Sequence, residues 1–246
     1  MGRLVLLQIG FFSALLLVGT FPGYAGSVSQ YPSVAIDVGH TKGHPGAMSA
    51  RGTSEFVFNQ AFAQQLRDAF AARGQRVRMI NENGGLKNLR ERSQYADGAA
   101  FLISVHHDSV QPHYLEKWTY NGGERRFSDR YSGFSLFVSR LNPHVAASRR
   151  CASAIGQSLQ ARGFSFTKHH AEPIAGEGRE WADAENGVYY YDELIVLKTA
   201  AQPALLFEAG IIVNRVEELE LLDADRRRKM ADAIADAMRV CMQNGK

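Results

Sequence analysis

The chain has 246 residues, of which 45% are hydrophobic and 22% are charged, and its formal net charge is +3. This length fits one α/β domain, or at most two small ones, with a core of normal size. The small positive charge is spread along the chain, so it excludes the basic stripe of a nucleic-acid-binding protein, and we expect no nucleic-acid partner.

The N-terminal segment has the pattern of a secretory signal peptide. Arg3 precedes an apolar run over residues 4–18, and a Gly-Tyr-Ala sequence at residues 23–25 forms a cleavage site of the small-x-Ala type. The alternative is a retained anchor, but the run is shorter than the ~20 apolar residues that span a bilayer. We therefore expect residues 1–25 to be removed on export to the periplasm or beyond, leaving residues 26–246 as one domain with no stable membrane span.

The rest of the chain predicts alternating strands and helices. Thr53 or Ser54 can cap the first helix, whose apolar face recurs at helical spacing, and Gly74 can end it. Residues 99–105 are almost all apolar, which is typical of a central strand covered on both faces. The expected strands are residues 33–37, 76–80, 99–105, 134–139 and 203–208, and the expected helices are residues 54–73, 86–96, 145–159 and two helices after residue 216.

Two long stretches show no such pattern. Residues 111–133 are polar with Trp118, Tyr120 and two adjacent glycines, and residues 167–192 are charged. We expect the first to be a long loop or insertion that forms a cleft wall or contacts substrate, and the second to be irregular.

The cysteines leave two alternatives open. In an exported protein, Cys151 and Cys241 can form a disulfide, but the sequence does not show whether they lie close enough. Cys241 also falls on an apolar stripe with helical spacing, so a buried free thiol is the other interpretation.

Alternation of strands and helices predicts an α/β fold with a mostly parallel twisted sheet and helices on both faces. In such sheets functional groups gather beyond the carboxyl ends of the strands. His40, His106 and Glu208 each lie at or just beyond the end of an apolar strand, so one edge of the sheet should collect all three.

These residues, with Glu55, make a candidate metal centre. A catalytic zinc usually takes three protein ligands, often two imidazoles and a carboxylate, and leaves a fourth position for water. We assign His40, Glu55 and His106 as the ligands and Glu208 as the carboxylate that moves the proton. Each residue alone also has a structural interpretation: a hydrogen-bonded histidine, a favourable charge at a helix start, or a salt-bridge partner.

Several segments resemble the zinc-dependent N-acetylmuramoyl-L-alanine amidases of the amidase_3 type, in order and over nearly the whole mature chain. The matching segments are Ile36-Asp37-Val38-Gly39-His40, Gly46-Ala47, Glu55 with Asn59, the helix with Arg92 and Ala96, Ile103-Ser104-Val105-His106, and residues 203–210 with Asn214. The resemblance implies one zinc ion on His40, Glu55 and His106, with Glu208 as catalytic carboxylate. It also implies a sheet of roughly six strands and cleavage of the amide between N-acetylmuramic acid and L-alanine in peptidoglycan or a muropeptide.

The chain departs from the family pattern near these residues. His44 lies in the loop after His40 and His107 follows His106, so either is a competing ligand candidate, with substrate contact or solvent exposure as the alternative. We name His107, Arg92, His169 and Glu172 as substrate-binding candidates, although Arg92 has a helix ion pair as its simpler interpretation.

Two other functions remain open at this stage. A carboxypeptidase-like zinc amidohydrolase acting on another amide would use the same metal chemistry. A non-catalytic envelope-binding or regulatory module on an amidase fold is less consistent with four chemically competent residues at the site. The sequence shows no separate wall-binding repeat, so we expect targeting to come from the catalytic domain or from a partner. Whether a protein activator is a further partner stays open.

Overall fold

The computed structural model describes residues 1–2 and 33–243. The proposed signal peptide at residues 1–25 lies almost wholly outside the described residues. Within them, no helix is long and apolar enough to cross a membrane.

A seven-stranded sheet forms the centre of the molecule, in the order β2-β1-β3-β9-β6-β8-β7. Strands β2, β1, β3 and β9 run parallel, whereas β6 is antiparallel to β9 and β7 is antiparallel to β8. The strands are β1 (Val34–Val38), β2 (Val77–Ile80), β3 (Phe101–Asp108), β6 (Ser135–Val138), β7 (Trp181–Asp183), β8 (Val188–Tyr190) and β9 (Ala204–Ile211). The predicted α/β class with a mostly parallel sheet is confirmed, with one strand more than the expected six.

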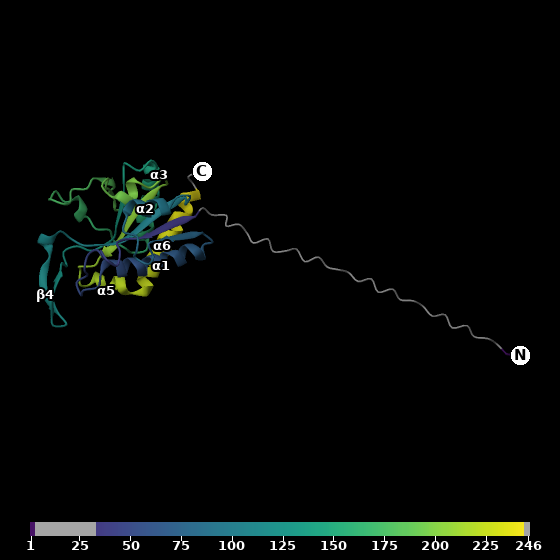
Figure 1. Cartoon of the computed structure of the whole chain (residues 1–246), viewed down its shortest axis with the longest axis horizontal. Coiled ribbons are helices and arrows are strands. Elements are labelled where there is room, and N and C mark those ends of the chain that lie inside the picture. Colours follow the sequence, from purple (N-terminus) through teal and green to yellow (C-terminus); the bar gives the residue numbers. More distant parts are fainter. Residues whose placement is uncertain (3–32, 244–246) are drawn as a thin grey trace.

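Helices cover both faces of this sheet (Figure 1). Helices α1, α3 and α6 pack on one face and on one another, and α2 and α4 pack on the other face, with α5 beside β9. Their bounds are α1 (Glu55–Ala72), α2 (Leu89–Tyr95), α3 (Val145–Ala161), α4 (Ile195–Lys198), α5 (Glu217–Leu222) and α6 (Ala224–Gln243), with short 3₁₀ turns at Pro112–Tyr114 and His169–Ala171.

Strand β1 shows how the sequence separates the two cores. Its side chains alternate, so Val34, Ile36 and Val38 join the core under α1, α3 and α6, while Ala35 joins the core under α2 and α4. Both faces are fully buried, which is why this strand is apolar except for the buried Asp37.

Cys151 and Cys241 form a disulfide between α3 and α6, with their Cα atoms 5.5 Å apart. The structure therefore favours the paired alternative over a buried free thiol. The bond closes a loop with a sequence separation of 90 residues.

Residues 111–133 were expected to be a long loop or an insertion, and the loop alternative is wrong for most of the stretch. This stretch contains an antiparallel hairpin of β4 (Glu116–Tyr120) and β5 (Gly123–Phe127), which projects from the body of the molecule (Figure 1). The turn is Asn121-Gly122, and both residues have positive φ, 49° and 76°. Asn-Gly in a two-residue turn is a strong hairpin signal, because both central residues of a type I′ turn need positive φ. The irregular stretch at residues 167–192 likewise contains the short strands β7 and β8.

Candidate metal centre

The parallel strands bring the predicted residues to one edge of the sheet. His40 lies two residues beyond β1, and His106 lies near the end of β3, which pairs with β1. Glu208 lies on β9 and is the direct ladder partner of His106. Glu55 reaches the same edge as the first residue of α1, where the helix dipole favours a negative charge.

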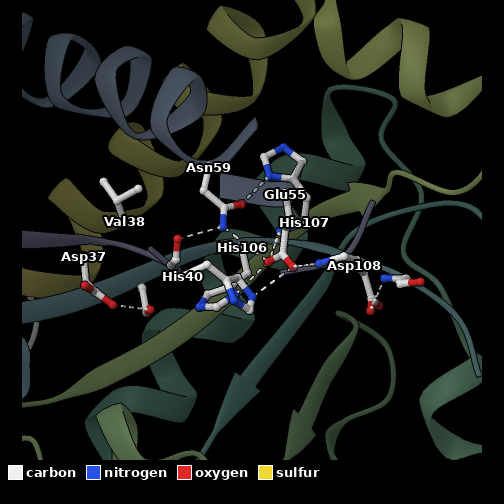
Figure 2. Close-up of polar contacts among 12 residues, drawn as sticks. Asp37, Val38, His40, Glu55, Asn59, His106, His107 and Asp108 are labelled. Atoms are coloured by element: carbon white, nitrogen blue, oxygen red, sulfur yellow. Dashed lines mark hydrogen bonds and ion pairs between the residues drawn. The ribbon is translucent and has the colours of Figure 1, made fainter. Parts of the chain in front are cut away.

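Glu55 lies between the two imidazoles and contacts both (Figure 2). Its Oε2 atom is 2.9 Å from His40 Nε2, and its Oε1 atom is 3.0 Å from His106 Nδ1. The His40 and His106 rings meet edge to face, with centroids 4.9 Å apart. One ligand atom from each of the three residues lies within 4.8 Å of the others, so the set can hold a metal ion.

The backbone around these ligands leaves little space. A Cβ atom on Gly39 would lie within 2.6 Å of His106 Cδ2, and one on Gly46 would lie 2.8 Å from His40 Nε2. Glycine is therefore required at both positions for the rings to approach the backbone. His40 itself has φ of 65°, a conformation that costs energy for a non-glycine residue and is concentrated at functional sites.

Asn59, one helical turn after Glu55 on α1, forms hydrogen bonds that hold the candidate ligands in place. Its Nδ2 atom donates to Gly39 O at 3.2 Å and to Glu55 Oε1 at 3.3 Å. Its Oδ1 atom lies 2.8 Å from His107 Nδ1. The backbone N–H of Ala47 also donates to Glu55 Oε2 at 3.1 Å. Each oxygen of Glu55 therefore accepts a hydrogen bond from a group other than the imidazoles: Oε1 from Asn59 and Oε2 from the Ala47 N–H.

The two carboxylates of the site have opposite electrostatic environments. Burial acts to raise the pKa of Glu55, but hydrogen bonds and charge from His106 and His40 outweigh burial and lower it well below the usual range. Burial raises the pKa of Glu208 well above its usual range, and the negative charges of Asp108 and Glu55 add to this effect. Glu208 Oε2 is buried without a hydrogen-bond partner among the described residues. Thus Glu55 suits a metal ligand, and Glu208 suits a group that gains and loses a proton.

His107 points away from the two ligand rings. Figure 2 shows it on the Asn59 side of the strand, and its ring packs against Phe58 and Phe62 of α1. Its exposed fraction is 1%, and burial lowers its pKa to about 3. The structure therefore places this substrate-binding candidate in the core, where its neutral ring supports Asn59.

Arg92 also has the contacts of a structural residue. Its guanidinium donates to the backbone carbonyls of Val38 at 3.2 Å, His40 at 2.5 Å and Leu86 at 3.0 Å. It lies 3.7 Å from the buried carboxylate of Asp37. Arg92 therefore holds the loop that carries His40, a role that its position on a short helix did not reveal.

The other two substrate-binding candidates, His169 and Glu172, both contact Tyr131. His169 is buried in the 3₁₀ turn, stacks on Tyr131 at a centroid distance of 5.1 Å and contacts Thr167 Oγ1 through Nδ1 at 2.8 Å. Glu172 accepts hydrogen bonds from the hydroxyls of Tyr131, at 2.5 Å, and Tyr114, at 3.0 Å. These contacts order the stretch that the sequence described only as irregular.

Two cavities flank the ligand set. One of about 310 Å³ lies against His40 and His106 and has mainly apolar walls. The other, of about 200 Å³, is lined by Glu208, Asp108 and His170. Leu194 and Leu206 line both, so the two cavities adjoin. The hairpin contributes Arg125 and Arg126 to a third hollow beside Ala47 and Met48, next to the loop that carries His40.

The sequence reasoning missed Asn81 and Glu177. Asn81 has φ of 57°, and its Nδ2 atom donates to the carbonyls of Val38 and His40 at 2.6 Å each. Glu177 contacts His170 Nδ1 at 2.9 Å. An Asn at a strand end is a signal for the left-handed conformation, but nothing in the sequence identified the partner of His170.

Comparison with known proteins gives the following matches. The profile of the Amidase_3 family, described as N-acetylmuramoyl-L-alanine amidase, matches residues 34–240. No curated protein sequence matches the chain.

Three solved structures illustrate the similarity of fold. Ami1 from Mycobacterium smegmatis, an N-acetylmuramyl-L-alanine amidase, has 21% identity and a TM-score of 0.66, with 87% of this chain and 97% of that chain covered. The catalytic domain of CwlV from Bacillus (Paenibacillus) polymyxa var. colistinus has 22% identity and a TM-score of 0.63, covering 85% and 96%. The CwlD amidase from Clostridioides difficile, solved in complex with the GerS lipoprotein, has 20% identity and a TM-score of 0.62, covering 87% and 100%.

Proposed function

The chain belongs to the N-acetylmuramoyl-L-alanine amidase family, and from this premise we propose that it is an exported zinc hydrolase of the cell wall. Its substrate is the amide between the lactyl group of N-acetylmuramic acid and the L-alanine of the stem peptide. Residues 26–246 form its zinc amidase catalytic domain. The observation that carries the proposal is the convergence of His40, Glu55 and His106 beside the buried carboxyl of Glu208.

The donor set fits zinc. Two imidazole nitrogens and one carboxylate, all within 4.8 Å, match the usual ligands of a catalytic zinc, which keeps a fourth position for water or substrate. Both imidazole–carboxylate distances, 2.9 and 3.0 Å, are close to the roughly 3.3 Å between ligands on a tetrahedral ion with bonds of about 2.0 Å. The low pKa of Glu55 gives the ionised form that a ligand needs.

When bound, zinc polarises the scissile carbonyl and activates a water molecule at neutral pH. Glu208 takes the proton of the attacking water and returns it to the leaving amine of L-alanine. Its Oε2 atom has no hydrogen-bond partner among the described residues, which leaves the carboxyl free for this transfer, and its raised pKa favours holding the proton. Asn59 and Arg92 act before the reaction, since they hold Glu55 and the backbone of His40 in place.

We propose export on two grounds. Residues 1–25 have the pattern of a signal peptide, and the Cys151–Cys241 disulfide suits an oxidising compartment such as the periplasm. Activation by a protein partner is part of the same proposal, and it is supported by the CwlD amidase, which was solved with the GerS lipoprotein.

The test compares the mature chain with Glu208→Gln, and with Glu185→Gln as an exposed carboxyl-to-amide control. We expect zinc in all three proteins and release of stem peptides from muropeptides by the wild type and the control. Glu208→Gln should lose activity by roughly 10²–10⁴-fold, the usual contribution of general acid–base catalysis. Zinc without cleavage of any muropeptide, even after addition of envelope extract, would reject the substrate; absence of zinc would reject the hydrolase.

A further inference from the structure

A second cluster of metal-ligand side chains lies beside Glu208. Asp108 ends β3, and His169 and His170 begin the 3₁₀ turn at His169–Ala171. Asp108 Oδ2 is 2.8 Å from His170 Nε2 and 3.6 Å from His169 Nε2. Both histidines are buried, and one ligand atom from each of the three residues lies within 4.8 Å of the others.

The outer nitrogens of both rings are already occupied. His170 Nδ1 lies 2.9 Å from Glu177 Oε2, and His169 Nδ1 lies 2.8 Å from Thr167 Oγ1. In metal-binding histidines, the ring N–H that faces away from the metal usually donates a hydrogen bond to a carboxylate or another oxygen, which fixes the tautomer and the ring orientation. Here both rings show this arrangement, and both direct Nε2 towards the same oxygen of Asp108.

His169 supplies an independent observation. Its exposed fraction is 1%, and its Nε2 atom is buried without a hydrogen-bond partner among the described residues. A buried polar atom of this kind costs free energy unless something satisfies it. When Nδ1 donates its proton to Thr167 Oγ1, Nε2 carries a lone pair that faces the Asp108 carboxylate, an arrangement that a cation between the two would stabilise.

The spacing of the ligand atoms fits one ion. Bonds of about 2.0–2.1 Å to nitrogen and oxygen place tetrahedral ligands about 3.3 Å apart. The two measured Asp108–histidine distances, 2.8 and 3.6 Å, lie on either side of that value. Two imidazoles and a carboxylate favour zinc or a similar divalent transition metal over calcium or magnesium, which prefer oxygen ligands.

We propose that Asp108, His169 and His170 bind a second divalent transition metal ion, with Glu177 and Thr167 orienting the two imidazoles. This site is separate from the His40–Glu55–His106 set. Its open side is the cavity of about 200 Å³ that Glu208 also lines, so the ion would face substrate. A carboxylate or carbonyl oxygen of the substrate is the class of ligand that would complete its coordination.

A proton is the competing occupant of this position. Burial acts to lower the pKa of His170, but the carboxylate of Asp108, with help from Glu177, outweighs burial and raises it to about 9. An imidazolium between two carboxylates would satisfy His170 but would leave His169 Nε2 without a partner. The test therefore has to distinguish a bound metal from an ion-paired imidazolium.

The experiment measures metal content and cobalt absorption of the mature chain. The chain is stripped with a chelator and titrated with Zn²⁺ or Co²⁺ alone, and the bound metal is measured after gel filtration. We expect about two ions per chain in the wild type, and about one in both His169→Gln and His170→Gln, because a metal ion is lost with its ligands. His113→Gln is the matched control, since His113 is exposed and belongs to neither site.

Three further variants keep the test decisive. His40→Gln should also retain about one ion, and His40→Gln combined with His169→Gln should retain none. Glu177→Gln leaves all three ligands in place and should weaken the second ion by roughly 10–100-fold, so it covers the case in which a histidine variant fails to fold. One ion in the wild type, unchanged by His169→Gln or His170→Gln, would overturn the second site. That result would leave the amidase proposal intact, because the amidase proposal is tested by the metal content of His40→Gln and by muropeptide cleavage.

Discussion

Replacing Asn59 with leucine should weaken zinc binding without removing any ligand. The substitution keeps the branched shape of the side chain but deletes its hydrogen bonds to Gly39 O, Glu55 Oε1 and His107 Nδ1, all inside a fully buried position. Loss of a partner that orients a metal ligand usually costs 10–100-fold in metal affinity, which corresponds to about 1.4–2.7 kcal/mol.

The same change has a calculable effect on stability. Leucine leaves Gly39 O and the Nδ1–H of His107 buried without partners, and each such group costs about 1–3 kcal/mol. The sum, about 2–6 kcal/mol, should lower the melting temperature of the metal-free chain by roughly 5–20 °C. The zinc affinity is measured by a competition titration, and the melting temperature of the metal-free chain is measured by a melting curve in the presence of chelator.

Gln60→Leu is the matched control for Asn59→Leu. Gln60 is the next residue on α1, and its Nε2 atom donates to Glu82 O at 2.8 Å, away from the ligands. The Gln60→Leu variant should lose at most about 1.5 kcal/mol of folding stability, and its zinc affinity should equal that of the wild type. A zinc Kd for Asn59→Leu within about twofold of the wild-type value would refute the orienting role.

Three further predictions concern the backbone, the disulfide and a buried carboxyl. Gly39→Ala should weaken zinc binding by more than about tenfold, because the added Cβ meets the His106 ring, whereas Gly43→Ala, with nothing within 4 Å of its Cβ, should bind zinc as the wild type does. Replacing Cys151 and Cys241 together with alanine removes a 90-residue cross-link worth about 4–5 kcal/mol of chain entropy, so a melting temperature lowered by less than about 3 °C would contradict this reasoning. Burial raises the pKa of Glu217 to about 7, so protonation stabilises the folded chain fully below about pH 4.5, and that stability, on the order of 3 kcal/mol, is lost as the pH rises through 7. Urea unfolding between pH 4 and 8 should show this fall in the wild type and a flatter profile in Glu217→Gln.

The long apolar runs made most of the sheet predictable. Residues 33–37, 99–105 and 203–208 were expected to be strands, and they correspond to Val34–Val38, Phe101–Asp108 and Ala204–Ile211. Central strands of a parallel sheet bury both faces, so their sequences carry a strong signal. Strands β7 and β8 have only three residues each, and β7 is the edge strand of the sheet. Segments this short do not show a recognisable strand pattern in the sequence.

The convergence of the proposed ligands was predictable for a topological reason, whereas the residues that hold them in place were not. The rule that polar groups gather beyond the carboxyl ends of parallel strands located His40, His106 and Glu208 without knowledge of any contact. The direction in which a long side chain turns depends on partners distant in sequence. Arg92 bonds to carbonyls 52 and 54 residues away, so its surface-like position on an arginine-rich helix gave no indication of its burial.

The three consecutive residues His106, His107 and Asp108 show how strand geometry divides these roles. Side chains alternate along β3, so His106 and Asp108 lie on the face of the strand that lines the cavities, and His107 points to the opposite face, towards α1. The ladder then departs from regular pairing: His106 pairs with Glu208, but Asp108 pairs with Ile211, so β9 carries one extra residue over this step. A bulge of this kind re-aims side chains at an active site. Strand β3 thus contributes His106 to the proposed zinc ligands and Asp108 to the second cluster, with Glu208 beside them on the neighbouring strand. A one-residue change in this register would therefore disturb both clusters together, whereas the variants at His40 and His169 separate them.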